Sequence, residues 1–286
     1  MNKNLPVIKE YRLDRLTKCL ECIGKFESNR VNQRNCILSH YSNDKNSDIE
    51  HREKSIFRGM VLSSLRILRL ILGKADMIKL SANGKLIVIS YNTNLDLYDR
   101  VISLIIFELD CDLFNLLSYI VESKKTVYKK EIYQKLKDIM VGISDTQKTE
   151  RLDKWISILK QAKLILGVKK TLEIRKTTYE QILKDYSIDN LELDLFRKHF
   201  LDSYNELGRS TSGIVDIRKL REETITRLFL ISNQIFTERK FDESLRSLNL
   251  EDEGYLVSFG KPMGGGEKLF EYKNKYYKTI HIMEIG

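Results

Sequence analysis

Apolar residues return every three or four positions along most of this chain, which is the period of an amphipathic α-helix. Leu13, Leu16, Leu20 and Ile23 keep this spacing and predict a helix with one buried face over residues 11–23. The sequence contains only 2 Pro and 14 Gly among 286 residues, so few positions force a helix to break. We therefore expect a mainly helical protein.

The longest apolar pattern of the first third runs through residues 49–73, after a shorter predicted helix over residues 31–41. The positions predicted to be buried in the longer helix are Ile56, Phe57, Met60, Val61, Leu65, Leu68 and Ile71. Gly73 stands where a left-handed residue would cap this helix. Residues 77–89 then predict two short strands around an Asn-Gly turn, or a strand followed by a short helix.

The same order of elements returns in residues 104–175. Helices are predicted over residues 107–125 and 127–140, and Ser144 or Asp145 can cap a third helix. The residues predicted to be buried in this third helix are Leu152, Trp155, Ile156 and Leu159. A strand over residues 168–174 would close the unit.

The letters Leu-Ile-Leu-Gly occur twice, at residues 70–73 and 164–167. We interpret both as the apolar end of a third helix that turns at glycine into a strand. A helix with an exposed polar face, preceded by two helices and followed by a strand pair, is typical of a winged helix, a form of the helix-turn-helix. The repeat therefore favours two such subdomains in tandem.

The predicted fold class is mainly α with small β hairpins (α+β), built from tandem winged-helix (helix-turn-helix) subdomains with a helical connector. The predicted domains are an N-terminal arm plus a first winged-helix subdomain over 1–103, a second winged-helix-like subdomain over 104–175, a helical connector and linker over 176–211, and a C-terminal winged-helix subdomain over 212–286. The arm covers about the first eleven residues. The tip of the last wing contains Pro262 and Gly264–Gly266.

Composition narrows the class of protein. A hydrophobic fraction of 42% is enough to bury a core in each predicted domain. No stretch approaches the roughly 18 uninterrupted apolar residues of a membrane span, and the N-terminus lacks the apolar segment of a signal peptide. The 4 Cys follow no regular framework, which suits a reducing compartment. We expect a cytoplasmic protein with no membrane partner.

Positive charge gathers in the first third of the chain. The net charge is +9, and residues 1–100 contain 18 Lys and Arg against 11 Asp and Glu. A polyanion such as DNA would explain this asymmetry through Coulomb attraction and counterion release. The alternative is an ordinary solvated surface.

Cys19 and Cys22, followed by Cys36 and His40, have nearly the ligand set and spacing of a tetrahedral zinc site. However, Cys19 and Cys22 lie inside a helical pattern, and Cys36 stands in an apolar run as a core residue would. The sequence therefore favours structural cysteines, and no metal site is predicted in this chain.

A nuclease centre needs clustered carboxylates and a lysine to hold Mg²⁺ and activate water. The Glu-x-Lys pattern with polar space around it is Glu238-Arg239-Lys240, which opens a predicted helix and so lacks the strand geometry of such a centre. The sequence shows neither a phosphate-binding loop nor a nucleophile elbow. This chain is therefore predicted to have no catalytic residue and no cofactor.

An α-helix fits the major groove of B-DNA, where each base pair presents its own donors and acceptors. The predicted DNA-binding residues lie in the arm, at the start of the second helix, and near the starts of both third helices. They are Lys3, Asn4, Lys9, Arg12, Arg15, Asn29, Arg30, Asn32, Gln33, Arg34, His51, Arg52, Lys54, Ser55, Arg58, Ser144, Asp145, Gln147, Lys148, Glu150 and Arg151. The alternative for each is an ordinary solvated helix face.

The stretches EKSIFRGMVLSSLRILRLILG and SDTQKTERLDKWISILKQAKLILG, each with its wing, resemble the recognition half of type IIS restriction endonucleases of the FokI kind. The resemblance covers most of the chain as an arrangement of winged helices. It implies sequence-specific recognition of a short asymmetric site in double-stranded DNA, through the arm and the third helices. It also implies a covalently linked nuclease domain, expected to be absent from this chain, as the part that needs Mg²⁺.

Two other classes of function stay open. A plasmid replication initiator or a transcription regulator is also built from tandem winged helices, and directly repeated or palindromic sites would favour it. A protein-interaction adaptor is the third class, and failure to retain duplex DNA at low salt would favour that one.

Overall fold

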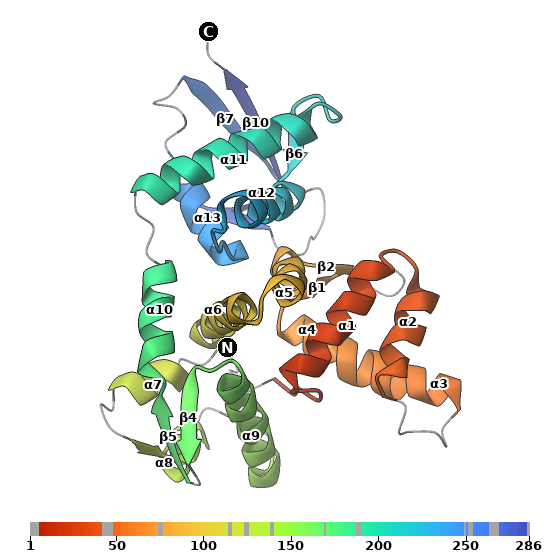
Figure 1. Ribbon diagram of the computed structural model, residues 1–286, viewed down its shortest axis with the longest axis vertical. Coiled ribbons are helices and arrows are strands. Elements are labelled where there is room, and N and C mark those ends of the chain that lie inside the picture. Colours follow the sequence, from red (N-terminus) through yellow and green to blue (C-terminus); the bar gives the residue numbers. More distant parts are fainter. Residues whose placement is uncertain are drawn as a thin grey trace. The chain divides into compact units, whose positions relative to one another are not determined.

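The computed structural model describes residues 6–41, 48–73, 77–113, 116–122, 126–137, 140–168, 170–186, 190–248, 250, 254–262 and 269–284. The chain divides into two compact units, Met1–Lys184 and Asp185–Gly286, which we call unit 1 and unit 2. Helices dominate and the sheets are small and antiparallel, which confirms the expected α+β class (Figure 1). Among the described residues, no helix is both long and apolar enough to traverse a bilayer.

Unit 1 begins with three helical segments and a strand pair (Figure 1). These are α1 (Leu13–Lys25), α2 (Arg30–Ser39), the continuous run of α3 (Ile49–Arg52), η1 (Glu53–Leu62) and α4 (Ser63–Ile67), and the strands β1 (Ile71–Leu72) and β2 (Lys79–Leu80). We call the continuous run the 49–67 helix. After β2 comes α5 (Ala82–Thr93), so a strand followed by a helix is the correct alternative for this region.

The middle of the 49–67 helix, η1, is a π-helix rather than the regular α-helix that the spacing predicts. π-helices close i→i+5 hydrogen bonds, are rare, and occur frequently at functional sites. Gly59 suits this geometry because a Cβ added to it would lie 2.9 Å from the carbonyl oxygen of Lys54. Ile56, Phe57 and Val61 are buried. The helical period of the sequence therefore predicted correctly which residues face the core, but it wrongly predicted a regular α-helix in place of the π-helix.

Both Leu-Ile-Leu-Gly stretches follow a turn from a helix into a strand, but the turn precedes them. α4 ends at Ile67 and α9 (Asp145–Gln161) ends at Gln161. The left-handed residues are Arg69, with φ of 59°, and Lys163, with φ of 57°. The four letters therefore begin β1 and β4 (Ile165–Val168), which corrects the prediction that they end the helices.

The hydrogen bonds of the two turns match. The N–H groups of Leu70 and Leu164 each donate to the carbonyl five residues earlier, at 2.9 and 3.0 Å. Their own carbonyls accept from the N–H groups of Ser81 and Arg175, both at 3.0 Å. Gly73 is left-handed, with φ of 85°, but it follows β1 and caps no helix. The repeated letters thus mark one structural element used twice.

Between Leu116 and Ile174, the second half of unit 1 has the order helix, strand, helix, helix, strand, strand. Its elements are α6 (Leu95–Leu113), α7 (Leu116–Glu122), β3 (Val127–Tyr128), α8 (Lys129–Lys137), α9, β4, β5 (Thr171–Ile174) and then α10 (Lys176–Tyr186). One antiparallel sheet has the order β3-β5-β4. As predicted, α9 buries Leu152, Trp155, Ile156 and Leu159.

A buried carboxylate connects three helices in this half. Asp110 of α6 accepts from the backbone N–H of Leu117 in α7 at 2.9 Å and from the indole N–H of Trp155 in α9 at 3.2 Å. Burial raises the pKa of Asp110 to about 6, and the two hydrogen bonds oppose the shift without cancelling it.

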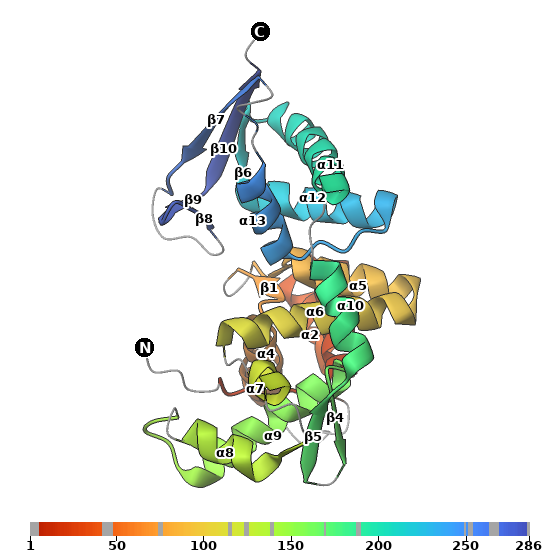
Figure 2. The same ribbon diagram turned by 90° about the vertical axis from the view of Figure 1, so that its left-hand side faces the viewer.

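Unit 2 repeats the order of residues 116–174 and adds a separate strand pair before its last strand. Its elements are α11 (Asn190–Gly208), β6 (Ile214–Asp216), α12 (Ile217–Ser232), α13 (Glu238–Ser247), β7 (Tyr255–Gly260), β8 (Phe270–Tyr272), β9 (Lys275–Tyr277) and β10 (Thr279–Glu284). The sheet has the order β6-β10-β7, and α11, α12 and α13 lie to one side of it (Figure 2). The predicted wing tip at Gly264–Gly266 lies outside the described residues.

The described part of the N-terminal segment packs on unit 1 instead of forming a free arm. Ile8 and Glu10 are only 2% and 1% exposed, and the N–H of Glu10 donates to the hydroxyl of Ser64 at 3.0 Å. A short segment that buries an apolar side chain and a carboxylate contributes to the core. Lys3 and Asn4, also predicted in the arm, lie outside the described residues.

Candidate nucleic-acid interface

Three arginines from two helical segments meet on the carboxylate of Glu53, at the start of η1. Arg30 Nη2 donates to Oε1 at 2.6 Å, and Arg34 Nη1 donates to Oε2 at 3.0 Å. Arg58 donates to Oε1 through Nη2 at 2.8 Å and through Nε at 3.1 Å. We call these four residues the arginine cluster. It combines three positive charges with one negative charge.

The local sequence of α2 explains how two of these arginines meet. Asn29 caps the helix, and its side chain accepts from the N–H of Asn32 at 3.1 Å. Arg30 and Arg34 then stand four residues apart, which places them on one face of the helix. That face meets the start of η1, where Glu53 lies.

The cluster holds its carboxylate charged and keeps one arginine in solvent. Hydrogen bonds from Arg58 and Arg34 lower the pKa of Glu53 to about 2, while burial opposes the shift and Arg30 adds to it. The side chain of Arg58 is 59% exposed, and those of Arg30 and Arg34 are 23% exposed. A guanidinium presents five donors in a planar fork that matches phosphate or guanine.

Other predicted DNA-binding residues are exposed on the same helix or beside it. His51, Lys54 and Ser55 are exposed, although the Ser55 hydroxyl donates to the carbonyl of His51 at 2.8 Å. Lys9 Nζ lies 3.9 Å from the position that a Cβ on Gly59 would take. The structure therefore brings Lys9 of the N-terminal segment to the helix that carries Arg58.

Two other predicted DNA-binding residues in this region donate to backbone carbonyls. Gln33 is 1% exposed, and its Nε2 donates to two backbone carbonyls at 3.3 and 3.1 Å. Arg52 donates from Nη2 to the carbonyls of Leu38 and Tyr41, both at 3.2 Å. Gln33 is buried, which corrects its assignment to the DNA surface, whereas Arg52 is half-buried and uses part of its guanidinium to bind the backbone.

Arg12 and Arg15 pair with a buried carboxylate. Arg12 binds both oxygens of Glu10, each at 3.0 Å, and Arg15 Nη1 lies 3.9 Å from the same group. The hydroxyl of Tyr41 also donates to Glu10, at 2.8 Å. Burial raises the pKa of Glu10, but the hydrogen bonds from Arg12 and Tyr41 outweigh it, so the pKa is lowered. These two guanidiniums are tied to the fold.

The start of α9 is a capping box. The Ser144 hydroxyl accepts from the N–H of Gln147 at 3.3 Å, and Gln147 Oε1 accepts from the N–H of Ser144 at 3.2 Å. This reciprocal pair satisfies two backbone donors at the helix end. Ser144 is therefore the cap, and the polar groups of both predicted DNA-binding residues stabilise the helix.

Three carboxylates of α9 gather along one groove, each paired with a lysine. Asp145, Glu150 and Asp153 line this groove together with Tyr11 and Lys154, and we call the three carboxylates the acidic face. Glu150 accepts from Lys154 Nζ at 2.6 Å. Lys148, also predicted to bind DNA, lies 3.6 Å from Asp145, and the predicted Arg151 is half-buried. Asp153 also pairs with Lys129, so each of the three carboxylates has a lysine partner, and the face offers phosphate no excess of positive charge.

A basic hollow next to the acidic face was missed by the sequence analysis. It is lined by Tyr128, Lys129, Lys130, Tyr133 and Lys170, among others, and we call these five residues the basic hollow. The N–H of Lys129 donates to the carbonyl of Lys170 at 2.9 Å, which joins the start of α8 to the β4–β5 turn. The Lys-Lys pairs at 129–130 and 169–170 were the available sequence signal.

At the start of the corresponding helix of unit 2, α13, the polar groups of Thr237 and Lys240 bind other groups of the protein. Thr237 caps it by accepting from the N–H of Lys240 at 3.1 Å. Lys240 is 2% exposed and donates from Nζ to the carbonyl of Asp185 at 2.7 Å. The Glu238-Arg239-Lys240 pattern opens this helix, as predicted.

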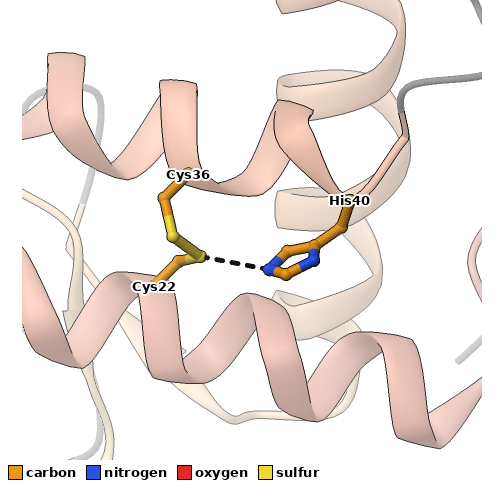
Figure 3. A group of neighbouring side chains, drawn as sticks. All are labelled: Cys22, Cys36 and His40. Atoms are coloured by element: carbon orange, nitrogen blue, oxygen red, sulfur yellow. Dashed lines mark hydrogen bonds between the residues drawn. A yellow bond between two sulfur atoms is a disulfide. The ribbon is translucent and has the colours of Figure 1, made fainter.

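The side chains of Cys22, Cys36 and His40 lie together between α1 and α2 (Figure 3). Cys22 and Cys36 form a disulfide with Cα atoms 5.7 Å apart, whereas the sequence predicts reduced cysteines. His40 Nε2 lies 3.6 Å from Cys22 Sγ. Cys36 is half-buried where the two helices meet. The apolar residues next to it in the sequence had wrongly suggested a fully buried core cysteine. Cys19 is a free buried thiol, and burial raises its pKa to about 12.

Comparison with known proteins gives no matching family model, no matching curated protein and no matching solved structure.

Proposed function

We propose that this protein recognises a short specific sequence in double-stranded DNA, with the 49–67 helix as its main recognition helix. The arginine cluster is the observation that supports this best. Its three guanidiniums are held at fixed positions by Glu53, and Arg58 is 59% exposed. A preorganised guanidinium loses less side-chain freedom on binding phosphate or guanine.

The exposure of each arginine suggests its role. Arg30 and Arg34 are mostly covered and suit contacts to phosphate, which position a protein on the duplex. Arg58, with neighbouring Lys54, is available for the base edges that specify sequence. Lys9 adds a cation beside the same helix.

The order of elements supports a tandem winged-helix architecture. From α7 to β5, and in unit 2 apart from the added strands β8 and β9, three helices and three strands follow the order helix, strand, helix, helix, strand, strand. In both sheets the last strand lies between the first two, as β3-β5-β4 and β6-β10-β7 show. Helix-turn-helix proteins place their last helix in the major groove, and the 49–67 helix has that place in the first subdomain.

Unlike the 49–67 helix, α9 carries the acidic face. We infer that α9 makes few phosphate contacts and that the neighbouring basic hollow takes this role in the second subdomain. Lysines beside the exposed Tyr128 and the half-buried Tyr133 suit a nucleic-acid backbone and its bases.

The class of protein that we propose is the recognition half of a type IIS restriction endonuclease, acting in the cytoplasm. Cutting would belong to a linked nuclease domain that uses Mg²⁺. A tandem winged-helix replication initiator or transcription regulator is the second candidate, because the repeated order of elements supports it equally.

Selection of bound duplexes from a random pool at low salt tests the proposal. We expect one short asymmetric motif, bound with an affinity that falls steeply as salt rises. Repeated or palindromic motifs would favour the second candidate. Retention of no duplex, or of duplexes without any common motif, would contradict sequence-specific recognition.

A further inference from the structure

The group of Cys22, Cys36 and His40 lies at the contact of two helices and is open on one side. Cys22 comes from α1, while Cys36 and His40 come from the last turn and the C-cap of α2 (Figure 3). Their ligand atoms all lie within 4.8 Å of one another. Cys22 is buried, Cys36 is half-buried and His40 is exposed, so solvent has access from the His40 side.

We propose that Cys22, Cys36 and His40 bind one zinc ion when the two cysteines are reduced, and that the disulfide and the zinc complex are alternative states of one site. Thiolate and imidazole are the ligands that Zn²⁺ prefers in proteins. Disulfide sulfur lacks the thiolate charge that metal binding needs, so the two states exclude each other.

The distances suit a tetrahedral ion. Zn–S and Zn–N bonds of about 2.3 and 2.0–2.1 Å place a sulfur and a nitrogen ligand about 3.6 Å apart and two sulfurs about 3.8 Å apart. Cys22 Sγ and His40 Nε2 are already 3.6 Å apart. Only the two sulfur atoms must separate, and the Cα distance of 5.7 Å leaves room for this through side-chain rotation.

The fourth ligand position is left to water or another small ligand. Cys19, three residues before Cys22, does not join the group. It is 0% exposed and lies against Tyr41 and Glu10 instead. The Cys19-x2-Cys22 spacing in the sequence therefore contributes one ligand and not two.

The change between the two states takes two steps, reduction of the disulfide and binding of zinc. A dithiol reductant transfers two electrons to the Cys22–Cys36 bond, which takes up two protons and gives two thiols, while the reductant becomes a disulfide. Zn²⁺ then replaces the two thiol protons, which leave to water, and accepts the lone pair of His40. In the reverse direction, a disulfide oxidant takes two electrons from the two thiolates and two protons from water to become a dithiol, while the Cys22–Cys36 bond forms and the ion is released.

Metal titration of the full chain tests the proposal. The protein is reduced, stripped of metal by a chelator and titrated anaerobically with Co²⁺ as a spectroscopic probe, and then with Zn²⁺. We expect one equivalent of Co²⁺ with a thiolate-to-cobalt charge-transfer band and intense tetrahedral d–d bands, both abolished by one equivalent of Zn²⁺. The disulfide form should bind neither ion, and zinc should raise the melting temperature of the reduced form alone.

Variants assign the ligands. Cys22→Ser and Cys36→Ser should abolish the charge-transfer band or halve it, and His40→Ala should weaken zinc affinity at least tenfold. His40 is exposed, so its variant should fold normally, which circular dichroism checks. Cys19→Ser is the matched control and should bind like the unmodified chain. Reduced protein without a charge-transfer band, or equal loss in Cys19→Ser, would overturn the proposal.

Discussion

The 49–67 helix and α9 occupy equivalent places in unit 1 and differ in charge. Each is followed by a left-handed residue, and each leads into a strand that begins within a Leu-Ile-Leu-Gly stretch. One presents the arginine cluster, and the other presents the acidic face. One scaffold can thus carry opposite surfaces, because the buried side sets the fold and the exposed side is free to vary.

The largest expected effect concerns the buried sides of the two helices. Phe57 and Trp155 are 0% and 1% exposed, and replacing either by Ala should lower the free energy of unfolding by about 3–5 kcal/mol. Trp155→Ala should cost more, because it also leaves the buried Asp110 without its indole donor. Urea unfolding followed by circular dichroism measures both. A larger loss for Phe57→Ala would contradict the role given to Asp110.

The second prediction compares DNA binding by the exposed sides of the 49–67 helix and α9. Arg58→Ala should weaken binding to the selected DNA by about 1–3 kcal/mol, or roughly 5- to 150-fold. Glu150→Ala on α9 should leave the affinity unchanged or increase it, because it removes a charge that repels phosphate. Arg209→Ala, at an exposed position in unit 2, controls for a general loss of positive charge. Equal losses for Arg58→Ala and Arg209→Ala would reject the arginine cluster as the recognition site.

The third effect is a pH dependence of stability. The folded pKa of Glu53, about 2, lies below its ordinary value of 4.5, so its contribution is complete above pH 4.5 and is lost as the pH falls towards 2. We expect Glu53→Gln to destabilise the protein by about 1–2 kcal/mol at pH 7, with a difference that shrinks in acid. Glu150→Gln is the exposed counterpart on α9 and should change stability little. A Glu53→Gln difference that is constant between pH 7 and 3 would count against the linkage.

The smallest effect tests whether the two turns are equivalent. Glycine adopts the left-handed conformation of Arg69 and Lys163 without a Cβ clash, so replacing either by Gly should stabilise the protein by up to about 1 kcal/mol. Each variant also loses a surface ion pair, to Asp112 or Asp99, which contributes little. Thermal melts of both variants should shift alike. A shift of opposite sign in one of them would show that the turns differ in strain.

Several features of the candidate site were not predictable from the sequence. The pattern identified Arg30, Arg34 and Arg58 as cations but not their shared carboxylate, since Glu53 lies 23 positions after Arg30 in the sequence. It also gave no sign that Arg52 would bind backbone carbonyls. Such pairings depend on how α2 packs against the 49–67 helix, which local spacing does not encode.

What the sequence determined by itself is the set of buried faces, a polar cap for α9 at Ser144 or Asp145, and the basic character of the first third. Those features follow from helical period, local hydrogen bonding and composition, which act over a few residues. Only the tertiary structure decided the π-helix at Gly59, the left-handed turns before Leu-Ile-Leu-Gly, the pairing of Cys22 with Cys36, and which cations remain in solvent. Each of these depends on atoms that are distant along the chain or on backbone packing, because burial and neighbouring charges set the free energy of a polar side chain.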